Sequence, residues 1–235
     1  MATFVLVHAA GGSTWDWHRL VPELRALGHD AVTMDLPCED EDATLAGYAA
    51  AVVDAVDAAG ARGGDLAVVG HSLGGITAAL VAGELDAGLL VFVTAMVPAP
   101  GETISDWWAN TRHEQADPDD DEVTAYLDDV EPALAAEALR RSRGQTMGGM
   151  HEPWPLPALP AVPTRAVVCT LDRFFPPDFM RRVLAERLGD AAGEPLELVA
   201  GHCPALSRPA ELAALLDRCW AGRHRQGGDA DVREP

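Results

Sequence analysis

Residues 66–76 read Leu66-Ala67-Val68-Val69-Gly70-His71-Ser72-Leu73-Gly74-Gly75-Ile76. The apolar start of this run predicts a buried strand, and the residues after Gly75 favour a helix. The Gly-x-Ser-x-Gly pattern between them predicts a sharp turn, because glycine permits an abrupt reversal and leaves room for neighbouring backbone. We therefore expect a strand, a tight turn and a helix, with Ser72 at the tip in a strained conformation.

A serine at such a turn projects above the sheet and is a candidate nucleophile. The start of the following helix, including the backbone N–H of Leu73, would face negative charge that develops on a substrate. The alternative is a structural tight turn, since five-residue patterns of this kind also occur by chance. The strand on one side and the helix on the other favour the nucleophile.

Outward from this turn, short apolar runs alternate with longer helical patterns, which predicts an α/β fold with a mostly parallel sheet flanked by helices. The expected strands are Phe4–Val7, Ala31–Met34, Leu66–Val69, Leu89–Thr94, Arg165–Cys169 and Leu196–Val199. The expected helices are Trp17–Leu27, Thr44–Ala59, Leu73–Leu85, Pro177–Leu188 and Pro209–Trp220.

Residues 98–160 interrupt this alternation, because they contain no convincing strand pattern. We expect a helical cap here, inserted into a core of residues 1–97 and 161–222; a solvated surface excursion is the alternative. Residues 223–235 are poor in apolar side chains and are expected to form a disordered tail. Large apolar side chains of the cap are expected to line a substrate pocket or, alternatively, to attach the cap to the core. They are Trp107, Trp108, Met147, Met150 and Trp154.

The loop after the first expected strand contains Ala9-Ala10-Gly11-Gly12. It leaves the sheet beside the Ser72 turn, and its small residues let backbone amides approach a bound carbonyl closely. We expect the N–H of Ala10 to be the second donor to a developing oxyanion, with an ordinary glycine-rich connection as the alternative.

His202 is the best candidate for the base that activates Ser72. It follows the last expected strand directly, and an imidazole is suited to accept and return a proton near neutral pH. Asp172 follows the preceding strand and is the expected carboxylate partner. Asp178 competes for that role, but its place after Pro176-Pro177 suits the start of a helix. Cys203, next to His202, is not expected to be catalytic, since a nucleophile should sit on the turn itself.

The amino-acid composition argues against several classes of binding partner and of chemistry. The 235-residue chain has 37 acidic and 17 basic residues and a formal charge of −20, which disfavours nucleic acid and anionic membranes. All basic residues are arginine, so a side-chain Schiff base is excluded. Four scattered cysteines indicate neither a metal site nor a redox motif, and no cofactor is expected. The N-terminal residues do not resemble a leader, so we expect a cytoplasmic protein.

These motifs resemble the α/β-hydrolase superfamily, and within it the short branch that includes plant hydroxynitrile lyases and methyl-ester esterases. The resemblance extends from Phe4 to about Leu216 and is weakest in the cap; it rests on the His8 loop with Trp15 and Trp17, Gly70–Gly75, Asp172–Phe179 and Gly201-His202. Cyanohydrin-cleaving relatives rely on a lysine after the catalytic histidine and a threonine beside the oxyanion loop. This chain has Cys203-Pro204 and Ala9 there, so the resemblance favours ester hydrolysis.

The resulting expectation is a serine hydrolase that cleaves an ester or lactone of an uncharged hydrophobic small molecule through an acyl-enzyme on Ser72. Cofactor-free perhydrolysis or C–C bond hydrolysis on the same triad, and a non-catalytic ligand-binding protein of this fold, remain open at this point. So do the identity of the substrate and the formation of a homodimer.

Overall fold

A computed structural model gives the fold and describes residues 1–113, 121–146 and 148–223. Its six strands form a single parallel sheet in the order β2-β1-β3-β4-β5-β6. They are β1 (Thr3–Val7), β2 (Asp30–Thr33), β3 (Leu66–His71), β4 (Leu89–Val93), β5 (Thr164–Cys169) and β6 (Leu196–Leu198). The predicted α/β fold with a parallel sheet is confirmed, and each strand begins and ends within two residues of its expected bounds.

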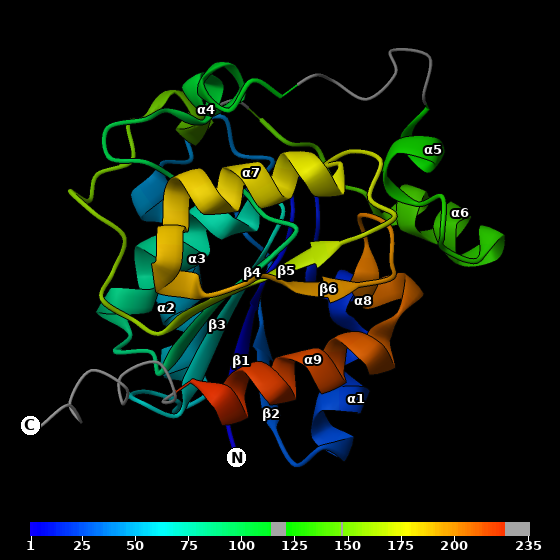
Figure 1. Ribbon diagram of the computed structural model, residues 1–235, viewed down its shortest axis with the longest axis horizontal. Coiled ribbons are helices and arrows are strands. Elements are labelled where there is room, and N and C mark those ends of the chain that lie inside the picture. The colour runs from blue at the N-terminus through cyan, green and yellow to red at the C-terminus, as the bar shows by residue number, and fades with distance from the viewer. Residues whose placement is uncertain (114–120, 147, 224–235) are drawn as a thin grey trace, which may run out of the picture.

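Helices cover both faces of the sheet (Figure 1). One face packs against α2 (Leu45–Ala58), α3 (Gly74–Glu84) and α7 (Pro177–Leu188). The other packs against α1 (Leu20–Ala26) and α9 (Pro209–Gly222). The helix expected from Trp17 to Leu27 begins only at Leu20, as α1. Trp17 instead ends a separate short helix, η1 (Thr14–Trp17), which the Ser13 side chain caps. The remaining short helices of the core are η3 (Gly189–Ala192) and α8 (Pro204–Ser207).

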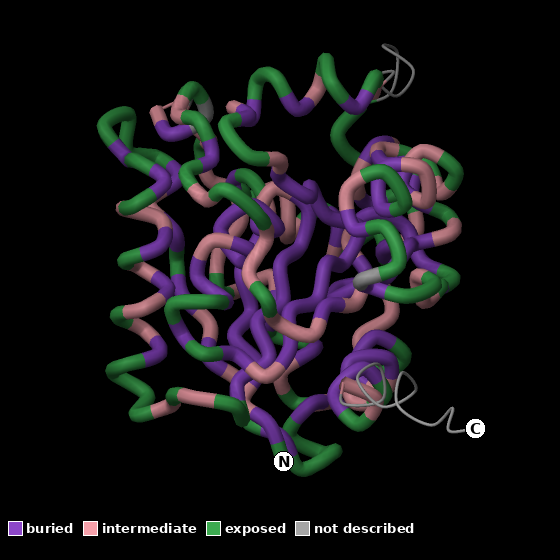
Figure 2. The backbone as a smooth tube through the Cα atoms, turned by 60° about the vertical axis from the view of Figure 1, so that its left-hand side comes forward, coloured by how far each residue is buried: buried purple, intermediate pink, exposed green. Residues whose placement is uncertain are grey.

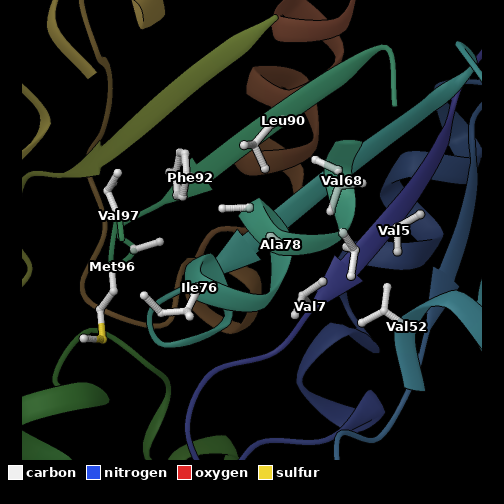
Figure 3. Close-up of a cluster of buried hydrophobic side chains, with 14 of the residues drawn as sticks. Val5, Val7, Val52, Val68, Ile76, Ala78, Leu90, Phe92, Met96 and Val97 are labelled. Atoms are coloured by element: carbon white, nitrogen blue, oxygen red, sulfur yellow. The ribbon is translucent and has the colours of Figure 1, made fainter. Parts of the chain in front are cut away.

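The core lies on both sides of the sheet, because alternate residues of a strand point to opposite faces. Val5 and Val7 of β1 pack with the cluster that includes Val52 of α2 and Ile76 of α3 (Figure 3). Phe4 and Leu6 belong to the opposite cluster. Burial on both faces explains why the central strands read as nearly continuous apolar runs, and these strands form the buried centre in Figure 2.

The segment between β4 and β5 contains α4 (Ile104–Asn110), α5 (Glu122–Tyr126), α6 (Pro132–Arg141) and the short helix η2 (Gly148–His151). Within the described part of residues 98–160, no strand is present. Figure 1 shows α5 and α6 beyond one end of the sheet, away from α4. Residues 224–235, most of the expected tail, lie outside the described residues. None of the helices in the described part of the chain is long and apolar enough to cross a membrane.

Candidate active site

The turn after β3 has the predicted strained form. Ser72 has a φ of 51°, in the left-handed region that residues other than glycine rarely adopt. The backbone on either side is tightly packed: a Cβ atom at Gly74 would lie 2.5 Å from the carbonyl oxygens of Val7 and His8. Glycine is therefore required at position 74, and the turn holds the Ser72 hydroxyl at the carboxyl end of the sheet.

Three side chains that are far apart in the sequence meet at this end of the sheet. The Oγ atom of Ser72 lies 3.0 Å from Nε2 of His202, and Nδ1 of His202 lies 2.9 Å from Oδ2 of Asp172. All three residues are buried. The structure thus brings the three predicted side chains into one hydrogen-bonded chain with the geometry that nucleophile activation requires.

Asp172 accepts hydrogen bonds at both carboxylate oxygens. Oδ1 accepts from the backbone N–H groups of Phe174 and Phe175, at 2.9 and 2.8 Å. Oδ2 accepts from the Thr94 hydroxyl as well as from His202. Burial alone would raise the pKa of Asp172, but the nearby charge of His202 and these hydrogen bonds outweigh it and hold the pKa below its usual range. The carboxylate therefore stays ionised and can orient the imidazole.

Thr94 was not anticipated from the sequence. It is fully buried just after β4 and has a φ of 37°, which is strained for a β-branched residue. In this conformation its hydroxyl donates to Oδ2 of Asp172. The available signal was its position at the carboxyl end of a strand that neighbours β5.

His71 was also missed as a contributor. Its Nε2 atom lies 2.7 Å from the carbonyl oxygen of His202. Burial, and then the charge of His202, lower the pKa of His71 to about 3, so the ring is neutral. Because a carbonyl only accepts, the proton of this neutral ring must be on Nε2. His71 thus ties the Ser72 turn to the loop that carries His202.

The two predicted oxyanion donors are available. The N–H groups of Leu73 and Ala10 donate to no other group among residues 1–113, 121–146 and 148–223. Both residues line the same cavity as Ser72. His8 helps to shape the Ala10 loop: its Nε2 accepts from Leu36 N–H at 2.9 Å, so its protonated Nδ1 donates to the Ala9 carbonyl at 2.7 Å. The arrangement fits a site for negative charge.

A cavity of about 500 Å³ lies over Ser72 between the sheet and the cap. Its apolar wall includes Trp17, Ile104, Trp108, Tyr126, Leu127, Phe174 and Leu206. Asp16, Glu122, Arg143 and Gln145 are among its polar lining residues. Burial raises the pKa of Asp16 to about 6. Asp16, Tyr126 and Phe174 were not predicted as lining residues, because no motif in the sequence marks them.

The structure divides the five cap residues that were expected to line this cavity. Trp108 does line it. Trp107 and Trp154 do not, which corrects the expectation: both are buried in the core beneath the cap, where Trp107 donates from Nε1 to the Val97 carbonyl at 3.0 Å. Met147 lies outside the described residues, as does the side chain of Met150.

The competing residues have other environments. Asp178 is exposed at the start of α7 and pairs with Arg181 at 2.6 Å, as expected of a charge at a helix N-terminus. Burial raises the pKa of the Cys203 thiol, which disfavours the reactive thiolate. No cluster of metal-ligating side chains occurs in the described ranges.

The cap makes a hydrogen bond to each of three loops of the site. Asp129 accepts from the backbone N–H of Gly201 at 2.8 Å, next to His202. Nε2 of His113 lies 2.7 Å from the carbonyl of Phe174, in the Asp172 loop. Gln145 accepts from the N–H of Gly11 at 3.2 Å. The cap is therefore hydrogen-bonded to the loops that carry His202, Asp172 and Ala10.

Comparisons with known proteins agree with this architecture. A model of the alpha/beta hydrolase family matches residues 4–215. Probable esterase PIR7A of Oryza sativa subsp. indica is 40% identical over 108 residues, or 42% of this chain and 41% of that protein. Methylesterase 7 of Arabidopsis thaliana is 32% identical over 104 residues, 40% of each protein. The matches thus span about two fifths of the length of these curated relatives.

Solved structures match over nearly the whole chain. Polyneuridine aldehyde esterase superimposes with a TM-score of 0.77 and 21% identity over 93% of this chain and 99% of that one. An extracellular alpha/beta-hydrolase from a Paenibacillus species gives 0.76 and 19% over the same shares. At these identities the likeness shows the fold alone.

Proposed function

Because the chain belongs to the alpha/beta hydrolase family, we propose that it is a serine esterase that hydrolyses carboxylic esters of uncharged hydrophobic small molecules. The observation that carries this proposal is the unbroken hydrogen-bonded chain from Ser72 through His202 to Asp172, beneath a cavity with a largely apolar wall. The names of the rice and Arabidopsis relatives, an esterase and a methylesterase, support the reaction type.

In the first half of the proposed reaction, Ser72 Oγ adds to the ester carbonyl carbon while Nε2 of His202 takes the hydroxyl proton. The N–H groups of Leu73 and Ala10 donate to the resulting oxyanion. The C–O bond to the alcohol then breaks, and His202 returns the proton to the leaving oxygen. The products of this half are a free alcohol and an acyl group on Ser72.

Water completes the cycle by the same route. His202 removes a proton from water as its oxygen adds to the acyl carbon, and the Ser72 oxygen leaves and regains the proton. The overall change is ester plus water to acid plus alcohol. Asp172 stays ionised throughout because its pKa is held low, and it stabilises the imidazolium that forms twice per cycle.

The cavity favours particular substrates. Its volume of about 500 Å³ suits a small molecule, and its wall contains several aromatic and aliphatic side chains. The wall carries Asp16 and Glu122 against one cation, Arg143, which pairs with Glu39 at 3.0 Å. This balance and the net charge of −20 oppose anionic groups. Neutral aryl or medium-chain acyl esters are the substrates that this environment should accept.

The test is hydrolysis by the purified protein of neutral and anionic esters of similar size, combined with labelling by a fluorophosphonate probe. We expect preference for the neutral esters and covalent labelling at Ser72, both lost in Ser72→Ala. Ser105→Ala is the matched control, because Ser105 is exposed on the cap and does not line the cavity. Undiminished hydrolysis by Ser72→Ala would refute the proposed mechanism.

A further inference from the structure

The cap and the oxyanion loop are joined around Gly11. The backbone N–H of Arg143 donates to the Gly11 carbonyl at 2.8 Å, and the Gly11 N–H donates to Oε1 of Gln145 at 3.2 Å. Gly11 has a φ of +61°, and a Cβ atom there would lie 2.6 Å from the Arg143 carbonyl oxygen. Both polar groups of this glycine are thus bound by the cap, at the residue directly after Ala10.

Gln145 is itself held in one orientation. Its Nε2 atom donates to the Tyr48 hydroxyl at 3.0 Å and to the Thr146 carbonyl at 3.1 Å. These bonds use both amide hydrogens, and Oε1 faces the donor of Gly11. The Gln145 amide therefore bridges Tyr48 of α2 and the oxyanion loop, and it has no donor left for a substrate in the adjoining cavity.

The two oxyanion donors differ in how they are fixed. Leu73 lies at the start of α3, an 11-residue helix, so its N–H is set by regular structure. Ala10 is in a short loop: on one side His8 and the Gly12 N–H hold the Ala9 carbonyl, and on the other side the cap holds Gly11 through Gln145 and the Arg143 N–H. Removing the Gln145 contact would free the N–H of the peptide unit between Ala10 and Gly11 and would leave the Arg143 N–H as the cap's remaining bond to Gly11.

We propose that Gln145 is a positioning residue for the reaction: it orients the Ala10 N–H toward the oxyanion by holding Gly11. This inference rests on the proposed esterase function. Transition-state stabilisation requires a donor that is already in place when the charge develops, so the effect of Gln145 belongs on kcat.

The main test is Gln145→Met, which keeps the length of the side chain but replaces the amide oxygen that accepts from Gly11 with an apolar end. We expect kcat for a neutral aryl ester to fall about 10- to 100-fold, below the ~100- to 1,000-fold loss known for deletion of an oxyanion donor itself. KM should change less than about threefold, because ground-state binding does not need the donor. The acid limb of the kcat profile should keep its midpoint, since Ser72, His202 and Asp172 are untouched.

A second readout isolates the oxyanion. An aryl trifluoromethyl ketone adds to an active serine and forms a tetrahedral adduct that carries the same charge. Its affinity for Gln145→Met should fall by the same factor as kcat/KM, in line with the behaviour of transition-state analogues. An affinity equal to that of the wild type would contradict the positioning role.

Thr146→Val is the matched control within the same segment. It removes the hydroxyl that donates to the Asp40 carbonyl at 2.9 Å, which is no part of the oxyanion loop, and Thr146 does not line the cavity. Its kcat should equal that of the wild type. Tyr48→Phe removes one support of the Gln145 amide and should lower kcat in the same direction by about threefold or more, which keeps the test open if Gln145→Met does not fold.

The outcomes separate cleanly. Three results would each overturn the inference: an unchanged kcat in a folded Gln145→Met, a loss of kcat in Thr146→Val equal to that in Gln145→Met, or a change in Gln145→Met that is confined to KM. If Gln145→Met does not fold, an unchanged kcat in Tyr48→Phe would overturn it. If the wild type neither hydrolysed esters nor reacted with the fluorophosphonate, the proposed function would fail and this inference with it. Activity in the wild type combined with any of the first results would refute the inference alone.

Discussion

Thr94→Val removes the hydroxyl that donates to Oδ2 of Asp172 and keeps the β-branched shape. Valine is as strained as threonine at a φ of 37°, so the substitution changes one hydrogen bond and little else. Because Asp172 is buried and ionised, the lost bond is one to a charged group. We expect it to destabilise the protein by about 1.5–3 kcal/mol near neutral pH.

The same loss predicts how the effect depends on pH. The loss raises the pKa of Asp172 toward its ordinary value, because the Thr94 hydroxyl stabilises the ionised carboxylate. A carboxyl whose pKa is depressed on folding stabilises the protein above its unfolded pKa, and that stabilisation disappears as the pH falls through the folded value. The difference between wild type and Thr94→Val should therefore be full near neutrality and shrink in acid.

Chemical denaturation from about pH 3 to 8 measures this difference directly. Thr111→Val is the control, because the equally buried Thr111 hydroxyl donates to the neutral carbonyl of Trp107 at 2.7 Å. Its effect should be independent of pH. A Thr94→Val protein as stable as the wild type at neutral pH, or a difference that grows in acid, would refute the assigned role of Thr94.

Three further predictions concern the site and the cap. Asp172→Asn should fold normally but lose about 10⁴-fold in kcat, as in other triads, whereas Asp178→Asn should turn over normally; equal steady-state rates for the two variants would move the acid elsewhere. Trp108→Ala should alter kcat/KM ratios among neutral esters, while Trp107→Ala should lower the free energy of unfolding by about 3–5 kcal/mol in a denaturant titration; the reverse pattern would contradict their placement. Cys203→Ser should keep most activity, since burial raises the pKa of the thiol; a folded but inactive variant, found by ester assay and circular dichroism, would show a catalytic thiol.

The fold could be predicted because its signals are local. The run from Leu66 to Ile76 contains strand, turn and helix in one continuous piece, and the other strands are apolar runs separated by helical patterns. Parallel strands that are buried on both faces typically appear in a sequence as nearly continuous apolar runs. The start of the helix expected at Trp17 was placed three residues too early, because Trp17 belongs to a short helix that depends on the side-chain cap at Ser13.

The candidate triad could be named because each member follows a strand and parallel strands present their carboxyl ends at one edge. Thr94 and His71 also lie at strand ends, but the Gly-x-Ser-x-Gly pattern leaves position 71 variable and no motif contains Thr94. Only the fold places them against Asp172 and His202. Trp107 and Trp108 show the limit of composition: successive residues of a helix point about 100° apart, so one is buried and the other faces the cavity.

The three cap contacts at Gly11, Gly201 and Phe174 limit how this enzyme could be redesigned. A cap transplanted from another protein of the fold would bring new side chains to the cavity, but it would also cut the bonds that hold the catalytic loops. A chimera that keeps Asp129 and Gln145 is expected to turn over its new substrates, whereas a graft chosen for pocket shape alone would bind them with a poorly assembled site. The proposed roles therefore predict that replacing the cap changes substrate selectivity and reaction rate together.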